Sequence, residues 1–247
     1  MSLFRTIVFV AAAAGLFSGI AMTVFQQAAT VPLILKAETY EEAEAEAEAA
    51  APATHTHDAA TPAHSHDTAA AHDHDEGGWQ PADGFERMAF TLAANVVGAI
   101  GFALLLVAAS ELAGGLTGWR DGLLWGLAGF AAFTLAPSLG LPPELPAMPA
   151  AELGPRQLWW TATAAATAGG IALIAYGRSL PAVIAALALI AAPHFIGAPQ
   201  PENFETPVPH DLAHNFVVAV VVTSFLFWAI LGGVAGLVRA RMAGAQP

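Results

Sequence analysis

The chain contains no cysteine, and only 11% of its 247 residues are charged. The absence of cysteine excludes disulfides, thiolate metal sites and a cysteine nucleophile. The scarcity of charge excludes an ordinary soluble domain, in which about a quarter of the residues are charged. The sequence also lacks a G-x-x-x-x-G-K-[ST] segment, so this chain does not bind ATP through a P-loop.

Hydrophobic residues make up 56% of the chain and gather in long apolar runs. These runs cover residues 6–25, 89–109, 122–139, 158–176, 180–197 and 213–238. Each approaches or exceeds the roughly 17–25 residues that a membrane-spanning helix needs, and only helices satisfy their own backbone in lipid. We therefore predict an all-α fold, a polytopic membrane helix bundle with about six transmembrane helices, or five if the first is cleaved as a signal peptide. Pro181 and Pro193 shorten the regular core of the fifth run, so it is either a full span or a re-entrant segment.

The sequence divides into three regions. Residues 1–36 hold the first transmembrane helix, 37–86 an acidic, histidine-rich external loop, and 87–247 the remaining bundle with an external cap over 137–160. The loop alternates Glu with Ala and then continues in Ala, Thr, Pro and His, so it cannot bury a core and is predicted to be disordered. The cap is rich in proline, and its Trp159 and Trp160 are predicted to be anchors at the membrane interface.

Charge is distributed unevenly along the chain. The formal net charge of −12 comes largely from residues 38–76, and such a polyanionic loop repels nucleic acid and attracts cations. The expected partners are therefore the lipid bilayer and cations, with no nucleic acid. With six spans, the bias of Lys and Arg among the loops places both termini in the cytoplasm and the acidic loop outside. All nine histidines fall on the external side if His194 and His214 lie at the outer ends of their helices.

A unit of two histidines and one aspartate recurs three times in the loop. Its members are His55, His57 and Asp58; His64, His66 and Asp67; and His72, His74 and Asp75. In an extended chain, side chains at i and i+2 point the same way, so both imidazoles of a unit can reach one ion. Imidazole suits nickel, cobalt, copper and zinc, and the units cannot select among these ions. The pattern favours capture of a divalent metal, which should fade below about pH 6, over a low-complexity linker.

Three further histidines lie near predicted helix ends. His194 stands in a Pro-His-Phe-Ile-Gly-Ala-Pro segment and is either a pathway ligand or a hydrogen-bonded packing residue. His210 and His214 have the i, i+4 spacing that places both on one helix face, as in zinc proteases. Asp211 replaces the glutamate of that motif, and Pro209 with Asp211 also suits an ordinary first helical turn. Both interpretations of this pair stay open.

Several segments together carry a resemblance to a known family. They are Gln26–Gln27, 31–35, 81–84, 136–146, 156–160, and Pro193-His194 with Gly197-Ala198-Pro199. Through these segments, which are spread over nearly its whole length, the chain resembles the CbtA family of predicted cobalt transporter subunits. The resemblance implies cobalt uptake across the bacterial inner membrane in connection with vitamin B12 supply, and a small one-helix, histidine-bearing partner (CbtB-like). Family members are usually described with about five spans, one fewer than the six counted here. His194 lies within a matching segment, whereas His210 and His214 do not.

The residues and the resemblance together predict a permease component for uptake of a divalent transition metal. Cobalt is favoured over nickel and zinc, and the metal is substrate rather than cofactor. No bound organic cofactor and no enzymatic activity are expected. Two alternatives remain: a membrane-embedded metal-dependent enzyme built on His210, Asp211 and His214, and an external metal sensor or buffer with a membrane anchor.

Overall fold

A computed structural model describes residues 2–50, 81–82 and 84–244. In these residues the chain forms helices and no strand, which confirms the predicted all-α class. In chain order the elements are α1 (Leu3–Ala29), α2 (Val31–Ala50), α3 (Phe85–Leu112), α4 (Trp119–Phe130), the π-helix η1 (Ala131–Leu135), α5 (Ala136–Ser138), α6 (Leu153–Tyr176), α7 (Leu180–Ile196) and α8 (His210–Gly244).

Each of the six predicted apolar runs is helical, but they differ in length. By length and composition, α1, α3, α6 and α8 qualify as membrane-spanning helices. The fifth run is the shorter apolar helix α7, with 17 residues. The third run is divided among α4, η1 and α5, because a π-turn interrupts its regular hydrogen bonding. The described chain therefore contains four long candidate spans, one short apolar helix and one interrupted helix.

The acidic segment after α1 differs from its prediction. Residues 37–50 were expected to be part of the disordered loop, but they belong to α2, which begins at Val31 directly after α1. Alanine and glutamate are among the strongest helix formers, so the Glu-Ala alternation forms a helix without burying a core. Residues 85–86, which close the predicted loop, likewise lie in α3.

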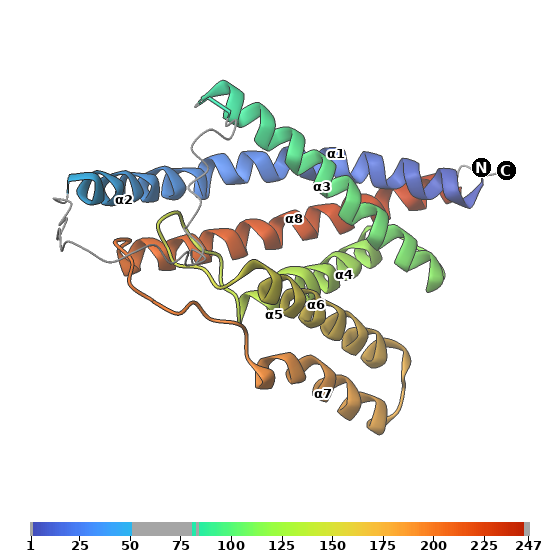
Figure 1. The fold of residues 1–247 in the computed structure, drawn as a ribbon. Coiled ribbons are helices and arrows are strands. Elements are labelled where there is room, and N and C mark those ends of the chain that lie inside the picture. Colours follow the sequence, from blue (N-terminus) through green and yellow to red (C-terminus); the bar gives the residue numbers. More distant parts are fainter. Residues whose placement is uncertain (1, 51–80, 83, 245–247) are drawn as a thin grey trace, which may run out of the picture.

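The helices form a bundle that opens at one side (Figure 1). Helix α1 packs against α3 and α8, and α4 packs along α8. The α6–α7 hairpin lies beside this group and contacts it mainly through η1 and α5. Both termini lie at one end of the bundle, and α2 extends beyond the opposite end (Figure 1).

Glycines allow α4 and α8 to pack backbone against backbone. A Cβ placed on Gly126 would overlap the carbonyl oxygen of Trp228, and one placed on Gly232 would overlap that of Gly122. Gly236 approaches the carbonyl of Gly118 in the same way. Small residues at such positions let membrane helices approach closely, and dispersion between the two backbones then stabilises the pair.

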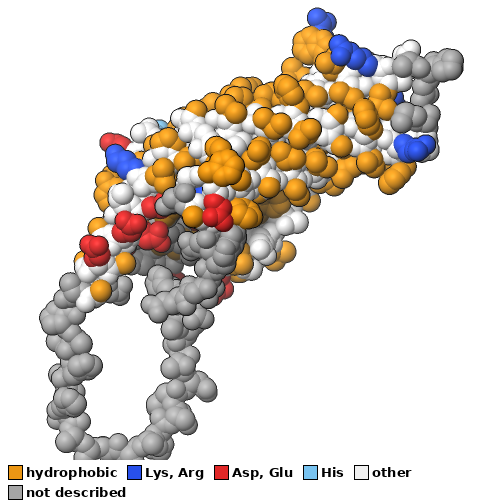
Figure 2. All heavy atoms as spheres, turned by 90° about the horizontal axis from the view of Figure 1, so that it is seen from above, with side chains coloured by type: hydrophobic (Ala, Val, Ile, Leu, Met, Phe, Trp, Pro, Cys, Tyr) orange, Lys and Arg blue, Asp and Glu red, His pale blue; other side chains and the backbone are white. Residues whose placement is uncertain are grey.

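Charged side chains gather at the two ends of the bundle and leave its middle apolar. Figure 2 shows Asp and Glu at one end with some basic side chains beside them, Lys and Arg at the other end, and hydrophobic side chains between the two ends. Many large apolar side chains are exposed on this middle band, among them Phe17, Val97 and Leu187. An exposed apolar band between two charged ends is expected of a protein whose solvent is lipid.

A second apolar cluster holds the cap in place at the acidic end. Its buried members are Ala37 of α2, Leu145 and Val208 of the connecting segments, and Leu212 and Phe216 of α8. Thr206 also donates a hydrogen bond through Oγ1 to the carbonyl of Ala147, at 2.9 Å. The cap is therefore packed between the base of α2 and the first turns of α8.

Candidate functional site

His194 lies in the last turn of α7, at the acidic end of the bundle, and is half-buried. Its imidazole stands edge-on to the indole of Trp159, with ring centroids 5.8 Å apart. The helix ends at Ile196, because Gly197, which follows it, has a φ of 88°, a left-handed conformation that suits glycine. The helix end thus presents one imidazole beside an aromatic wall.

Pro193 connects this histidine to α6. Its carbonyl accepts hydrogen bonds from the backbone N–H of Gly197 at 3.0 Å and from the indole Nε1 of Trp159 at 3.2 Å. Trp159 is buried, whereas Trp160 is exposed. Both tryptophans were predicted to be interface anchors, and for Trp159 that prediction is wrong, because its ring packs inside the helix hairpin.

Gly140, from the segment after α5, completes the wall behind His194. A Cβ at Gly140 would overlap the Trp159 ring and would lie 3.0 Å from the Cβ of Ala198. The segments around residues 140, 159 and 194–198, which are far apart in the sequence, therefore meet at one place. An ion pair between Arg156 and Glu144, at 2.8 Å, joins the start of α6 to the cap beside them.

His210 and His214 occupy the first two turns of α8, and both side chains are exposed, as is Asp211. The i, i+4 spacing places the two imidazoles on one face of α8. Leu212 and Phe216 lie on the other face and pack in the apolar cluster that holds the cap. Among the described residues, no group of three His, Cys, Asp or Glu side chains stands close enough to hold a metal ion. The structure thus shows His210 and His214 as an accessible pair and not as part of a three-ligand centre.

The three His-x-His-Asp units lie outside the described residues. The helices that flank them, α2 and α3, have the ends nearest these units at the same end of the bundle as the starts of α6 and α8 (Figure 1). Arg87 and Glu38 form an ion pair between these two helices. The segment that carries the units is therefore attached to the end where His194, His210 and His214 lie.

The opposite end carries a pairing that the sequence did not reveal. Arg239 of α8 donates from Nε to Glu111 Oε1 at 2.7 Å and from Nη2 to Oε2 at 3.3 Å. The two side chains are only 20% and 13% exposed. Because 128 residues separate them in the chain, no local pattern could have predicted this contact.

An interior hydrogen-bond group links α1 and α3. The amide Nδ2 of Asn95 donates to Thr23 Oγ1 at 3.0 Å and to Gln26 Oε1 at 2.7 Å. Thr23 itself donates back to the carbonyl of Gly19 in its own helix. Polar side chains that bond across helices are expected where lipid offers no alternative partner.

These features define a class: a polytopic helical membrane protein with imidazoles and carboxylates at one end and mainly arginines at the other. The chain belongs to the CbtA family, described as a probable cobalt transporter subunit, whose family model matches residues 4–240. No curated protein and no solved structure matches the chain. The family match confirms the resemblance seen in the sequence and identifies the chain as a transporter subunit, and as a subunit it implies a partner.

Proposed function

We propose that this protein is the membrane permease component of a system that takes up divalent transition metal ions, with cobalt as the preferred substrate. The single observation that carries the proposal is the placement of His194. It lies where three distant segments meet at the acidic end of an apolar bundle, in a chain whose family is that of cobalt transporter subunits. A neutral imidazole at a helix end is a suitable first ligand for such an ion.

The His-x-His-Asp units would raise the local concentration of the ion in front of this end. Six imidazoles and the neighbouring carboxylates on one segment form many weak sites rather than one tight site. An ion held weakly can be passed on, which conduction requires. His210 and His214, exposed on the same end, would supply a further two-imidazole relay position.

The charge distribution supports an orientation for this system. Arg5, Arg120, Arg178 and Arg241 belong to the end that holds the termini, and the carboxylates of α2 belong to the other. By the positive-inside rule, the termini would face the cytoplasm and the histidine-rich segment the periplasm of a bacterial inner membrane. The partner subunit would be the small one-helix, histidine-bearing protein that the family resemblance implies.

Radiolabelled cobalt uptake tests this proposal. Cells that express the chain together with the small partner should accumulate cobalt faster than cells with an empty vector. Excess unlabelled cobalt, nickel, copper and zinc, added one at a time, then measure selectivity by competition. Equal uptake with and without the chain, when the partner is present, would overturn the proposal.

A further inference from the structure

A cavity of about 200 Å³ lies between the helices of the bundle, away from His194. It lies between α1, α3, η1 and α8, is partly open to the outside at Ala94 and Gly98, and is lined by Met22, Ala94, Asn95, Gly98, Ala99, Phe102, Phe133, Thr134, Ser224, Phe227 and Trp228. Asn95 is ten residues into α3 and Ser224 is fourteen into α8, or about 15 and 21 Å along helix axes that rise 1.5 Å per residue. Along the helix axes, the cavity therefore lies well away from both ends of the bundle.

Three polar side chains face this cavity, and each keeps hydrogen-bonding capacity. Asn95 makes both of its side-chain hydrogen bonds through the amide nitrogen, which leaves its amide oxygen for another partner. The hydroxyl oxygen of Thr134 accepts from the indole Nε1 of Trp228 at 3.2 Å, so its proton remains to be donated. Ser224 makes no side-chain hydrogen bond within the described part of the chain. Polar groups at membrane depth that are not fully paired are costly unless water or a ligand reaches them.

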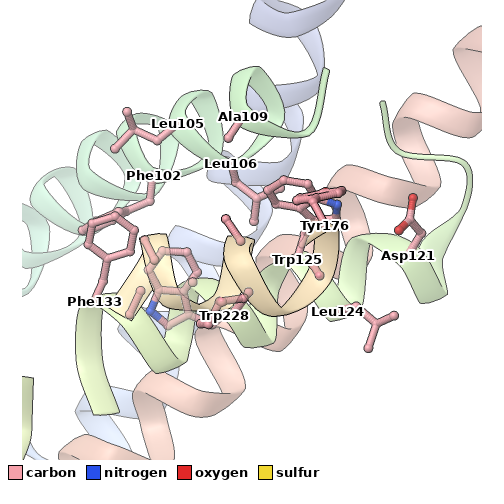
Figure 3. A pocket seen from close by; sticks show the side chains of 17 residues that line it. Phe102, Leu105, Leu106, Ala109, Asp121, Leu124, Trp125, Phe133, Tyr176 and Trp228 are labelled. Atoms are coloured by element: carbon pink, nitrogen blue, oxygen red, sulfur yellow. The ribbon is translucent and has the colours of Figure 1, made fainter. Parts of the chain in front are cut away.

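An aromatic plug separates this cavity from a larger groove. The plug consists of Phe102, Phe133 and Trp228, which line both spaces. Phe133 stacks on Trp228 with an interplanar angle of 11° and centroids 5.7 Å apart, and Phe102 stands 5.1 Å from Trp228. Beyond the plug, the groove of about 550 Å³ is mainly apolar and runs between α3, α4 and α6 to Asp121 and Tyr176 (Figure 3).

The plug is built on the π-turn. Phe133 and Thr134 belong to η1, where the backbone departs from regular α-helical hydrogen bonding. Single π-turns inside helices are frequent at functional sites, because they shift side chains that a regular helix would hold elsewhere. Thr134 bonds the Trp228 indole, so a change in the π-turn would move two of the three plug residues together.

We infer that this cavity is a water-filled station for a hydrated divalent cation on its way through the protein, and that the aromatic plug closes it toward the groove. The inference rests on the proposed transport function. Uncharged amide and hydroxyl groups hold the hydration shell of an ion without binding the metal tightly, and an ion held in this way can leave again. Asp121, at the far end of the groove, offers the next carboxylate.

Gly98 allows the station to be tested without disturbing the packing. It lines the cavity, and a Cβ placed on it would meet no atom within 4 Å. Gly101, one turn further along α3, also has open space at its Cβ but lines neither the cavity nor the groove. Because the chain has no cysteine, Gly98→Cys and Gly101→Cys each introduce the single thiol of the molecule.

Thiol labelling tests whether water fills the cavity. A water-soluble methanethiosulfonate reagent reacts with the thiolate, which forms only where water reaches the sulfur. In the purified full chain in lipid vesicles, Gly98→Cys should be labelled about tenfold or more faster than Gly101→Cys. Equal, slow labelling of both variants would mean that lipid or a partner helix fills the space, and would overturn the inference.

Cobalt uptake with cavity-filling variants tests whether the ion passes through. Gly98→Leu should lower uptake about tenfold by filling the station, whereas Gly101→Leu should stay within about twofold of the native chain. Both variants should keep the thermal stability of the native protein, since leucine favours a helix more than glycine does. If the native chain transports cobalt and Gly98→Leu transports it equally well, the station is wrong while the proposed function stands. If the native chain does not transport, the proposed function itself fails.

Discussion

The indole Nε1 of Trp159 donates a hydrogen bond to the carbonyl of Pro193, 3.2 Å away. The bond fixes the residue directly before His194, and the same indole forms the wall against which the imidazole stands. Trp159 is therefore a positioning residue for His194. The position of the histidine thus depends on a contact between two helices and not on α7 alone.

Trp159→Phe should keep the aromatic wall and remove the indole donor. Loss of this bond should cost about 1 kcal/mol of stability and lower cobalt uptake by loosening His194. Trp160→Phe is the matched control, because that neighbour is exposed and does not donate to the Pro193 carbonyl. Uptake and thermal unfolding in detergent measure the two effects. Equal uptake by the two variants would show that the function of His194 does not depend on the hydrogen bond from Trp159.

His194→Ala should lower cobalt uptake at limiting cobalt about tenfold, the factor that corresponds to about 1.4 kcal/mol. The imidazole is half-buried and makes an aromatic contact, so a small loss of stability is also expected. Phe195→Ala serves as the control, because Phe195 is 90% exposed at the same helix end. An undiminished uptake in His194→Ala would assign the histidine to packing only.

Gly232→Ala should destabilise the bundle, because its Cβ would overlap the carbonyl of Gly122 and force α4 away from α8. Overpacking of this kind typically costs about 1–3 kcal/mol. Gly233→Ala, at the next position, has open space at its Cβ and should be neutral or slightly stabilising. The fraction of monodisperse protein after heating in detergent distinguishes the two. Equal heat resistance would contradict the close α4–α8 crossing.

Glu111→Gln should weaken the end of the bundle that holds the termini. It leaves Arg239 largely buried without its charged partner, which should cost about 1–3 kcal/mol. Arg241→Gln, on an exposed side chain of the same helix, should change the unfolding temperature little. The exchange Glu111→Arg with Arg239→Glu should recover part of the loss. If Glu111→Gln unfolds at the native temperature, the pair contributes nothing.

Deletion of residues 51–80 should reduce uptake at low cobalt and leave the rate at saturating cobalt nearly unchanged, because the segment concentrates the ion and is not the pathway. Protonated imidazole cannot bind metal, so the benefit of the segment should be present at neutral pH and lost as the pH falls below about 6. Uptake by the native and deleted chains, measured across pH, should therefore converge at acidic pH. A constant ratio between them would exclude imidazole as the ligand.

The sequence determined the helical membrane class and the approximate positions of the apolar helices. Both follow from local rules: lipid requires long apolar segments, and those segments must satisfy their own backbone. The family match then confirmed the resemblance that the proline-rich and Leu-Trp-Trp segments had indicated. Residues 37–50 lack an apolar pattern, which by itself predicts disorder, but they form a helix because alanine and glutamate favour helix without such a pattern.

Only the tertiary structure brought Trp159 to Pro193, Arg239 to Glu111 and Trp228 to Thr134. Each of these contacts joins residues at least 34 positions apart, and it depends on how helices cross. Crossing geometry is set by small residues on two helices at once, as Gly122 and Gly232 illustrate, so neither helix specifies it alone. The sequence therefore identified the residues available for metal chemistry, while helix packing determined their positions and formed the cavity between the helices.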